Sequence, residues 1–186
     1  MLSPNRRVVV TEFISLDGVI DTPSWTAPYW NDEIAAFKAA EMASAEALLL
    51  GRVTYEAFAA AWPSSTDAGA AEMNAIPKHV ATTTLTQDDL DQTAWNARCL
   101  DGNVAEAVRA LRTEPGGDLL VYGSARLART LFGAGLVDEL RLLVYPVVLG
   151  AGKRLFETEQ ATLDLVDARP VGSGVTALVY RPAASA

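Results

Sequence analysis

The sequence predicts an α/β protein with a mixed, mostly parallel sheet that ends in an antiparallel C-terminal hairpin. From residue 7 to residue 132, short apolar runs alternate with amphipathic segments of helical period, the order that gives parallel strands covered by helices. The last third instead contains three strand-like segments, at 137–148, 163–171 and 175–181. Gly172-Ser173-Gly174 joins the last two as a hairpin. At 186 residues, half of them hydrophobic, the chain suits one domain over residues 1–186 with a sizeable core.

The individual elements follow from local patterns. The β-branched run at 7–15 predicts the first strand, and Leu16-Asp17-Gly18 closes it with a turn. Asn31 is expected to cap a helix that continues to about residue 45, because an Asn side chain accepts hydrogen bonds from first-turn N–H groups. We expect further helices at 54–61 and 103–112 and further strands at 47–50 and 78–84. Residues 64–75 indicate a loop with one helical turn, and 88–100 is ambiguous, with Trp95 and Leu100 as candidates for a short strand.

The stretch 119–132, LLVYGSARLARTLF, organises the rest of the chain. Three apolar residues predict a buried strand, and apolar residues at helical spacing follow Gly123. Ser124 is expected to cap this helix through its hydroxyl. A helix N-terminus at the carboxyl end of a buried strand suits an anion, and glycine lets a ligand approach the backbone. This predicts a phosphate site. An ordinary strand-to-helix turn is the alternative, because the full G-x-G-x-x-G pattern is missing.

Composition excludes several classes of protein. A net charge of −8 disfavours nucleic acid as a partner. The apolar runs are too short to span a membrane, and we expect no signal peptide and therefore a cytoplasmic protein. The sequence has one cysteine, Cys99, and one histidine, His79. A disulfide framework and a Cys/His zinc site are therefore excluded within one chain, and no metal is expected.

Five stretches carry a resemblance to a known family. They are FISLDGVID at 13–21, LLLGRVTYEAFAAAWP at 48–63, PKHVATTTL at 77–85, the run from Gly116 to Phe156, and the final hairpin. Together and in this order they resemble the dihydrofolate reductase-like superfamily, in the branch that contains the reductase domain of bacterial riboflavin biosynthesis. The resemblance implies a three-layer α/β/α sandwich, an NADPH-dependent reductase and a homodimer.

The resemblance also implies where a cofactor would bind. Three groups of residues would hold it: the turn of Gly51, Arg52 and Thr54 beside the diphosphate and ribose, Thr82 and Thr84 at the adenosine end, and Gly123, Ser124, Ala125, Arg126 and Leu127 around the diphosphate. A loop containing Pro146, Leu149, Gly150, Gly152 and Lys153 would lie on the nicotinamide side or beside the substrate. Thr83 stands where many relatives carry Arg, which weakens a 2′-phosphate clamp. NADPH is therefore the expected cofactor, with NADH left open.

Two carboxylates are the candidate catalytic groups. Asp17 ends the first strand, and Glu33 matches the carboxylate position at the start of the second element in true dihydrofolate reductases. Either could bond a ring N–H or relay a proton as hydride arrives. The alternatives are that Asp17 only caps its turn and that Glu33 only stabilises a helix start. Trp25 and Trp30, with Tyr29, form either the wall of a substrate pocket or a seal over the core.

The sequence therefore predicts an NADPH-dependent oxidoreductase that transfers hydride to a small pterin-like or pyrimidine-like heterocycle or to a carbonyl compound. The alternative is a nucleotide-binding protein without catalysis on the same fold. The substrate-phosphate motifs of the riboflavin-pathway branch and its zinc deaminase are missing from the sequence, so the riboflavin precursor is not the expected substrate. The expected partners are a small molecule and a second copy of the chain.

Overall fold

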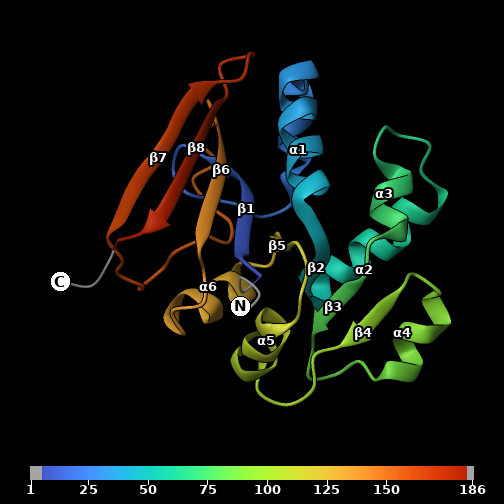
Figure 1. Cartoon of the computed structure of the whole chain (residues 1–186). Helices are drawn as coiled ribbons and strands as arrows, with labels where there is room; N and C mark the ends of the chain where they lie inside the picture. The colour runs from blue at the N-terminus through green and yellow to red at the C-terminus, as the bar shows by residue number, and fades with distance from the viewer. Residues whose placement is uncertain (1–5, 184–186) are drawn as a thin grey trace.

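The computed structural model describes residues 6–183, which form one sheet of eight strands flanked by helices (Figure 1). The strands are β1 (Val8–Ser15), β2 (Ala45–Gly51), β3 (Lys78–Ala81), β4 (Ala97–Cys99), β5 (Asp118–Tyr122), β6 (Glu139–Tyr145), β7 (Leu163–Pro170) and β8 (Thr176–Pro182). The α-helices are α1 (Asp32–Ser44), α2 (Arg52–Ala61), α3 (Ala70–Ala75), α4 (Gln87–Thr93), α5 (Val104–Thr113) and α6 (Ala125–Gly133). Two short 3₁₀ helices, η1 (Pro23–Tyr29) and η2 (Trp62–Ser64), complete the chain.

The strand order is β4-β3-β2-β5-β1-β6-β8-β7. The first six strands pair in parallel, whereas β8 is antiparallel to both β6 and β7. The expected mostly parallel sheet with an antiparallel C-terminal hairpin is thus confirmed. Because the carboxyl ends of parallel strands meet at one edge of a sheet, the residues after β1, β2, β3 and β5 lie together there.

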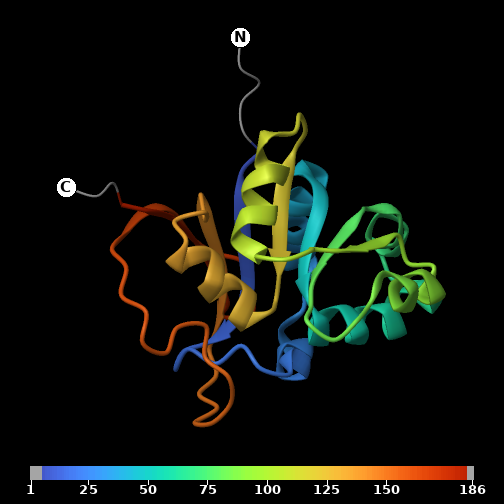
Figure 2. The same cartoon turned by 90° about the horizontal axis from the view of Figure 1, so that it is seen from below.

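Helices cover both faces of the sheet, as the α/β/α sandwich requires. Helices α5 and α6 lie on one face and α1 on the other (Figure 2). The α5/α6 face buries Val8 and Val10 of β1 against Leu127 and Leu131 of α6. On the opposite face, Val9 belongs to the cluster that packs under α2 and α3. This alternation along β1 is the period of two that a strand imposes.

Several element boundaries differ from those that the sequence predicts. The strand expected at 78–84 ends at Ala81, because the Thr82 hydroxyl accepts hydrogen bonds from the backbone N–H groups of Thr84 and Leu85 and turns the chain. The strand expected at 137–148 is shorter, at Glu139–Tyr145, and ends before Pro146, which lacks an N–H donor. The aromatic loop contains the 3₁₀ helix η1. The ambiguous segment 88–100 holds most of α4 and the short strand β4, and Trp95 and Leu100 lie just outside that strand.

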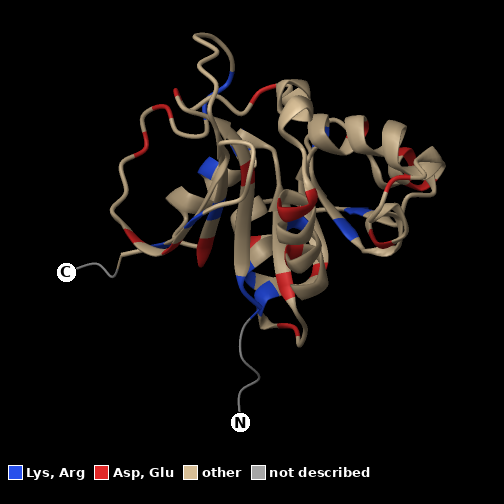
Figure 3. Ribbon diagram, turned by 90° about the horizontal axis from the view of Figure 1, so that it is seen from above, with Lys and Arg blue, Asp and Glu red and all other residues tan. Residues whose placement is uncertain are grey.

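Charged residues of both signs are mixed over the ribbon (Figure 3). One dense group joins β1, β5 and β6, where Arg7 bonds Asp118 at 2.7 Å and lies 3.4 Å from Glu139. Asp118 raises the pKa of Arg7 through its hydrogen bond, although burial acts in the opposite direction. In residues 6–183, no helix has both the length and the apolar character to cross a membrane.

Candidate active site

The turn between β5 and α6 has an unusual backbone. Gly123 and Ser124 both adopt left-handed conformations, with φ of 59° and 69°. Glycine tolerates such a conformation, whereas serine pays a steric cost for it, and such strain concentrates at functional sites. The turn brings the first N–H groups of α6 to the carboxyl edge of the sheet.

The Ser124 side chain does not cap α6, so this expectation is wrong. Its hydroxyl instead accepts a hydrogen bond of 2.7 Å from the Gly51 backbone N–H and donates one of 2.8 Å to the Thr54 hydroxyl. With Ser124 in a left-handed conformation, its oxygen reaches the β2–α2 turn and not the helix behind it. The first N–H groups of α6 are therefore left without a side-chain cap, as an anion site requires.

The structure brings four expected cofactor residues into contact across two turns. A Cβ atom on Gly51 would lie 2.9 Å from the Ser124 hydroxyl oxygen, and one on Gly123 would lie 3.4 Å from Thr54. Close approach of the two turns therefore requires glycine at position 51, whereas Gly123 is favoured by its left-handed φ of 59°. Ala125 and Leu127 are buried, so only their backbone N–H groups could serve a phosphate.

The residues expected at the adenosine end of a cofactor follow β3, next to these turns. Ala81 pairs with Gly51 in the sheet, so Thr82 follows directly beside the β2–α2 turn. Arg52, at the start of α2, forms an exposed ion pair with Glu56 at 2.8 Å. Arg126 is exposed on α6. Both arginines could therefore turn toward a bound phosphate at little cost, since exposed ion pairs are weak.

Asp17 is engaged on both carboxylate oxygens. It accepts hydrogen bonds from the Ser15 hydroxyl at 2.6 Å, from Leu149 N–H at 3.1 Å and from Gly150 N–H at 2.8 Å. Led by the Ser15 hydrogen bond, these contacts lower the pKa of Asp17 to about 2. A carboxylate held in the ionised form is a poor proton donor near neutrality. The geometry favours the capping role that the sequence left open: Asp17 fastens the 146–153 loop to the first strand.

Glu33 lies away from this region. It is exposed in the first turn of α1, where the Asn31 side chain caps Glu33 N–H and Ile34 N–H as expected. Glu33 lines a separate cavity of about 290 Å³ together with Arg169, Pro170 and Val171. The structure therefore places the two candidate carboxylates in different surroundings. Glu33 lies at the start of α1, which fits its alternative interpretation as a residue that stabilises the helix start.

The aromatic residues divide between core and surface. Trp25 and Tyr29 pack edge-on against the buried Tyr145 ring, with centroids at 5.4 Å and 5.7 Å. Trp30 is 51% exposed and approaches the Phe13 ring at 6.3 Å. Trp25 thus seals the core, while Trp30 is placed as a wall above Phe13. The cluster lies on the sheet face opposite α6, beside Ile34 and Phe37 of α1.

Sequence reasoning missed a buried charged group on the inner face of α1. The Lys38 ammonium donates to the Thr11 hydroxyl at 2.9 Å and pairs with Glu41, whose side chain is only 2% exposed. Burial by itself lowers the pKa of Lys38, but Tyr122 and Glu41 outweigh it, so this pKa lies above its ordinary value. The signal was the helical spacing, which puts Lys38 on the same stripe as Ile34 and Glu41.

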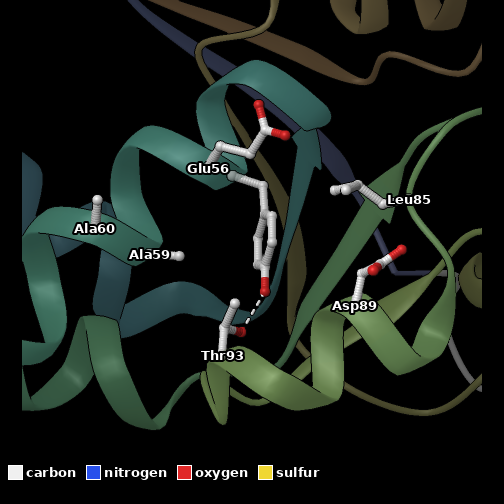
Figure 4. Close-up of a pocket in the computed structure, with 7 residues that line it drawn as sticks. Glu56, Ala59, Ala60, Leu85, Asp89 and Thr93 are labelled. Atoms are coloured by element: carbon white, nitrogen blue, oxygen red, sulfur yellow. Dashed lines mark hydrogen bonds between the residues drawn. The ribbon is translucent and has the colours of Figure 1, made fainter.

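A second cavity, of about 310 Å³, lies between α2 and α4 (Figure 4). It is lined by Tyr55, Glu56, Ala59, Ala60, Leu85, Asp89 and Thr93. The Tyr55 and Thr93 hydroxyls are hydrogen-bonded at its base. None of the site residues predicted from the sequence lines it, although Leu85 follows Thr84 at its rim.

This fold is that of the dihydrofolate reductase-like superfamily. The RibD C-terminal domain family matches residues 6–177, so the chain belongs to that family. The chain is 29% identical over 182 residues to the "Uncharacterized protein YyaP" of Bacillus subtilis (strain 168), covering 94% of both chains.

Among solved structures, a Shewanella sp. PV-4 protein provisionally named as a riboflavin biosynthesis protein has a TM-score of 0.77 at 20% identity, with 96% of this chain and 99% of that one covered. A pyrimidine reductase-like protein of Corynebacterium diphtheriae has a TM-score of 0.70 at 13% identity, covering 97% and 93%. For Acinetobacter baumannii RibD the TM-score is 0.66 at 15% identity, covering 97% of this chain and 58% of that one. These likenesses establish the fold.

Proposed function

We propose that this protein is an NADPH-dependent oxidoreductase that reduces a small heterocyclic or carbonyl substrate by hydride transfer. The observation that carries the proposal is the 2.7 Å hydrogen bond from Gly51 N–H to the Ser124 hydroxyl, which joins the β2–α2 and β5–α6 turns at the carboxyl edge of the sheet. Membership of the RibD C-terminal domain family adds support, because that family has a pyrimidine reductase-like fold.

The residues at this edge fit a dinucleotide. The N-terminus of α6 has no side-chain cap, so its first backbone N–H groups are available to the diphosphate. Thr82 and Thr84 follow β3 at the adenosine end. When bound, the nicotinamide supplies the hydride, and the chain's own residues orient the two reactants and exclude water.

Preference for NADPH would depend on the exposed cations near the adenosine end. Arg52 can exchange its pair with Glu56 for a 2′-phosphate, and Arg126 is free to reach the diphosphate from α6. Thr83 contributes no charge at this place. We therefore expect NADPH to bind more tightly than NADH, by a margin smaller than a dedicated arginine clamp would give.

Titration of the full-length protein with NADPH and with NADH, followed by tryptophan fluorescence, tests the proposal. We expect micromolar affinity for NADPH and weaker binding of NADH. Equal affinities would contradict the 2′-phosphate assignment, and no binding of either would contradict the proposed function. Tight binding without oxidation of NADPH by any of a panel of heterocycles and carbonyl compounds would instead support a non-catalytic nucleotide-binding protein.

A further inference from the structure

The cavity of about 310 Å³ between α2 and α4 is not part of the proposed cofactor site (Figure 4). Its walls are mainly apolar and include Ala59 and Ala60 of α2 and the Leu85 side chain. The Tyr55 ring lies at its base, is only 2% exposed and packs against Trp95 with the ring centroids 5.9 Å apart. The cavity therefore has a fixed aromatic base, and the two small alanines leave space above it.

The hydrogen bonds at the base of the cavity leave an acceptor there and no donor. The Thr93 hydroxyl donates to the Leu90 carbonyl at 2.7 Å, which engages its single proton. In its hydrogen bond with Tyr55 it must therefore accept, so the Tyr55 hydroxyl donates. Within residues 6–183, no group donates to the Tyr55 oxygen in return. A ligand that brings hydrogen-bond donors fits this base better than one that brings acceptors.

Asp89 places a fixed negative charge at the α4 side of the cavity. One of its oxygens, Oδ2, accepts hydrogen bonds of 2.8 Å from both the N–H and the hydroxyl of Thr86. The backbone hydrogen bond, followed by the one from the side chain, lowers the pKa of Asp89, so the carboxylate is ionised at neutral pH. The other oxygen, Oδ1, accepts no hydrogen bond from the part of the chain that the structure describes, and it remains for a ligand.

Glu56 places a second carboxylate at the α2 side, and this one is shared with the proposed cofactor site. The Arg52 guanidinium bonds both Glu56 oxygens, at 3.0 Å and 2.8 Å. Arg52 is also the cation proposed above for the 2′-phosphate. Glu56 is therefore neutralised while Arg52 faces it, and it regains its full charge when Arg52 turns to a phosphate. No lysine or arginine is among the residues that line the cavity.

We propose that this cavity binds a small organic ammonium ion with an apolar body, and that a bound cofactor strengthens this binding by drawing Arg52 away from Glu56. The ammonium would donate to Asp89 Oδ1 in the field of the Glu56 carboxylate, and the apolar body would lie against Leu85 and Ala59. Anions are repelled by both carboxylates and find no donor here. The ammonium site stands apart from the proposed function, whereas the coupling to the cofactor rests on it.

The coupling is reciprocal and small. If NADPH raises the affinity for the ammonium ion by some factor, the ammonium ion raises the affinity for NADPH by the same factor. The factor is limited by the strength of the Arg52–Glu56 pair, which is exposed and therefore weak. We expect about a two- to fivefold effect in each direction.

Three probes of similar size test the site in the cofactor-free, full-length protein by calorimetry. Phenethylammonium has the expected charge and apolar body, 2-phenylethanol has the same body without charge, and phenylacetate is an anion. We expect phenethylammonium to bind more tightly than the other two. Asp89→Asn keeps an acceptor for Thr86 and should weaken phenethylammonium about fivefold, the upper value for one exposed ion pair. Ala60→Phe, at an exposed position, should fill the cavity and abolish binding.

Asp88→Asn is the matched control. It removes the same charge from the first turn of the same helix, but Asp88 does not line the cavity. At about 0.15 M salt, charges beyond roughly 8 Å are screened, so phenethylammonium affinity should stay unchanged in this variant. The two- to fivefold effect of NADPH should also persist in it.

Glu56→Gln tests the link to the cofactor. It removes the carboxylate that competes for Arg52, so this variant should bind NADPH more tightly than the wild type does. Phenethylammonium affinity should fall in the presence of NADPH, and the mutual effect of the two ligands should disappear.

Phenethylammonium that binds the wild type no better than 2-phenylethanol at millimolar concentration, or that binds Asp89→Asn and the wild type equally, would overturn the site. An affinity that saturating NADPH leaves unchanged in the wild type would overturn the coupling through Arg52. If the wild type binds no NADPH, the proposed function is rejected, and the comparison of the three probes still decides whether the cavity binds an ammonium ion.

Discussion

The Gly51 backbone N–H donates a 2.7 Å hydrogen bond to the Ser124 hydroxyl, across 73 positions of sequence. This contact locks the turn after β2 to the turn after β5. It explains why a serine adopts a left-handed conformation here: the strained backbone aims the hydroxyl at Gly51 instead of at the N-terminus of α6. The geometry of the proposed diphosphate site depends on this single side chain.

Replacing Gly51 with alanine should separate the two turns. The added methyl group would lie 2.9 Å from the Ser124 oxygen, too close for the contact to survive. We expect NADPH affinity to fall at least about tenfold, since one charged hydrogen bond to phosphate is worth that much, and the melting temperature to fall as well. Fluorescence titration and thermal unfolding measure the two effects.

Gly133→Ala is the control for this substitution. Nothing lies within 4 Å of a Cβ atom at Gly133, at the end of α6. Alanine there should leave NADPH affinity unchanged and stabilise the protein by up to about 1 kcal/mol, because it restricts the unfolded chain. Unchanged affinity in Gly51→Ala as well would show that the turns do not hold the cofactor.

The sequence was a good guide wherever the determining contacts are local. Asn31 and Asn103 cap α1 and α5 through bonds to N–H groups two and three residues ahead, and nothing distant competes for these side chains. The apolar runs of β2 and β5 are buried on both faces, so their composition alone predicts central parallel strands.

Local sequence patterns fail to predict the role of a side chain when its hydrogen-bond partner is distant in the sequence. Ser124 has the sequence context of a helix cap, but its hydroxyl accepts a hydrogen bond from the Gly51 N–H instead. The burial of Lys38 depends on Thr11, 27 positions away, and on the stripe it shares with Glu41. Asp17 was placed correctly at the end of β1, yet its role depends on Leu149 and Gly150, more than 130 positions later. Such pairings become visible only once the strand order is known.

The substitution Asp17→Asn should show whether Asp17 caps its turn or takes part in catalysis. Asparagine lacks the second acceptor oxygen, so the bond to Leu149 or Gly150 is lost and the melting temperature should fall at neutral pH. The folded pKa of Asp17, about 2, lies below its ordinary value of 3.8. Its stabilising contribution is therefore present above about pH 4 and lost as the pH falls toward 2, so the difference from the wild type should vanish there. Melting curves against pH measure this, with the exposed Asp101→Asn as control.

Turnover of the Asp17 and Glu33 variants completes that comparison once a substrate is found. We expect Asp17→Asn to keep its rate below its melting temperature, and Glu33→Gln to keep both rate and stability. A loss on the order of 10²–10⁴ in rate would instead mark either group as a general acid or base. If both variants are fully active, neither carboxylate is catalytic.

Association of two chains through the C-terminal strands is a further prediction. Strand β7 lies at the edge of the sheet and exposes Leu165 and Val166 by 57% and 48%. Exposed apolar edge strands promote pairing with another chain. We expect a two-fold homodimer, and Leu165→Glu should convert it to a monomer in light scattering. Val53→Glu, at a position 60% exposed on α2, should leave the molar mass unchanged. A monomeric wild type at micromolar concentration would contradict the prediction.

Glu12 should make the protein less stable as the pH rises. It is 5% exposed, on the α6 face of β1 between Val10 and Ile14, and in the described chain one of its oxygens has no hydrogen-bond partner. Burial raises the pKa of Glu12 to about 8, against the opposing charge of Lys38. The folded state therefore holds a proton that the unfolded state releases above its ordinary value of 4.5.

Between these two values the folded state binds more protons, so its stability falls as the pH rises. Glutamine is neutral throughout and nearly the same shape. Glu12→Gln should therefore match the wild type near pH 4.5 and exceed its melting temperature by a growing margin up to about pH 8, beyond which the margin should level off. Glu106→Gln, on the exposed side of α5, should follow the wild type at every pH. A constant margin for Glu12→Gln across this range would mean that the carboxyl group is already ionised in the folded protein.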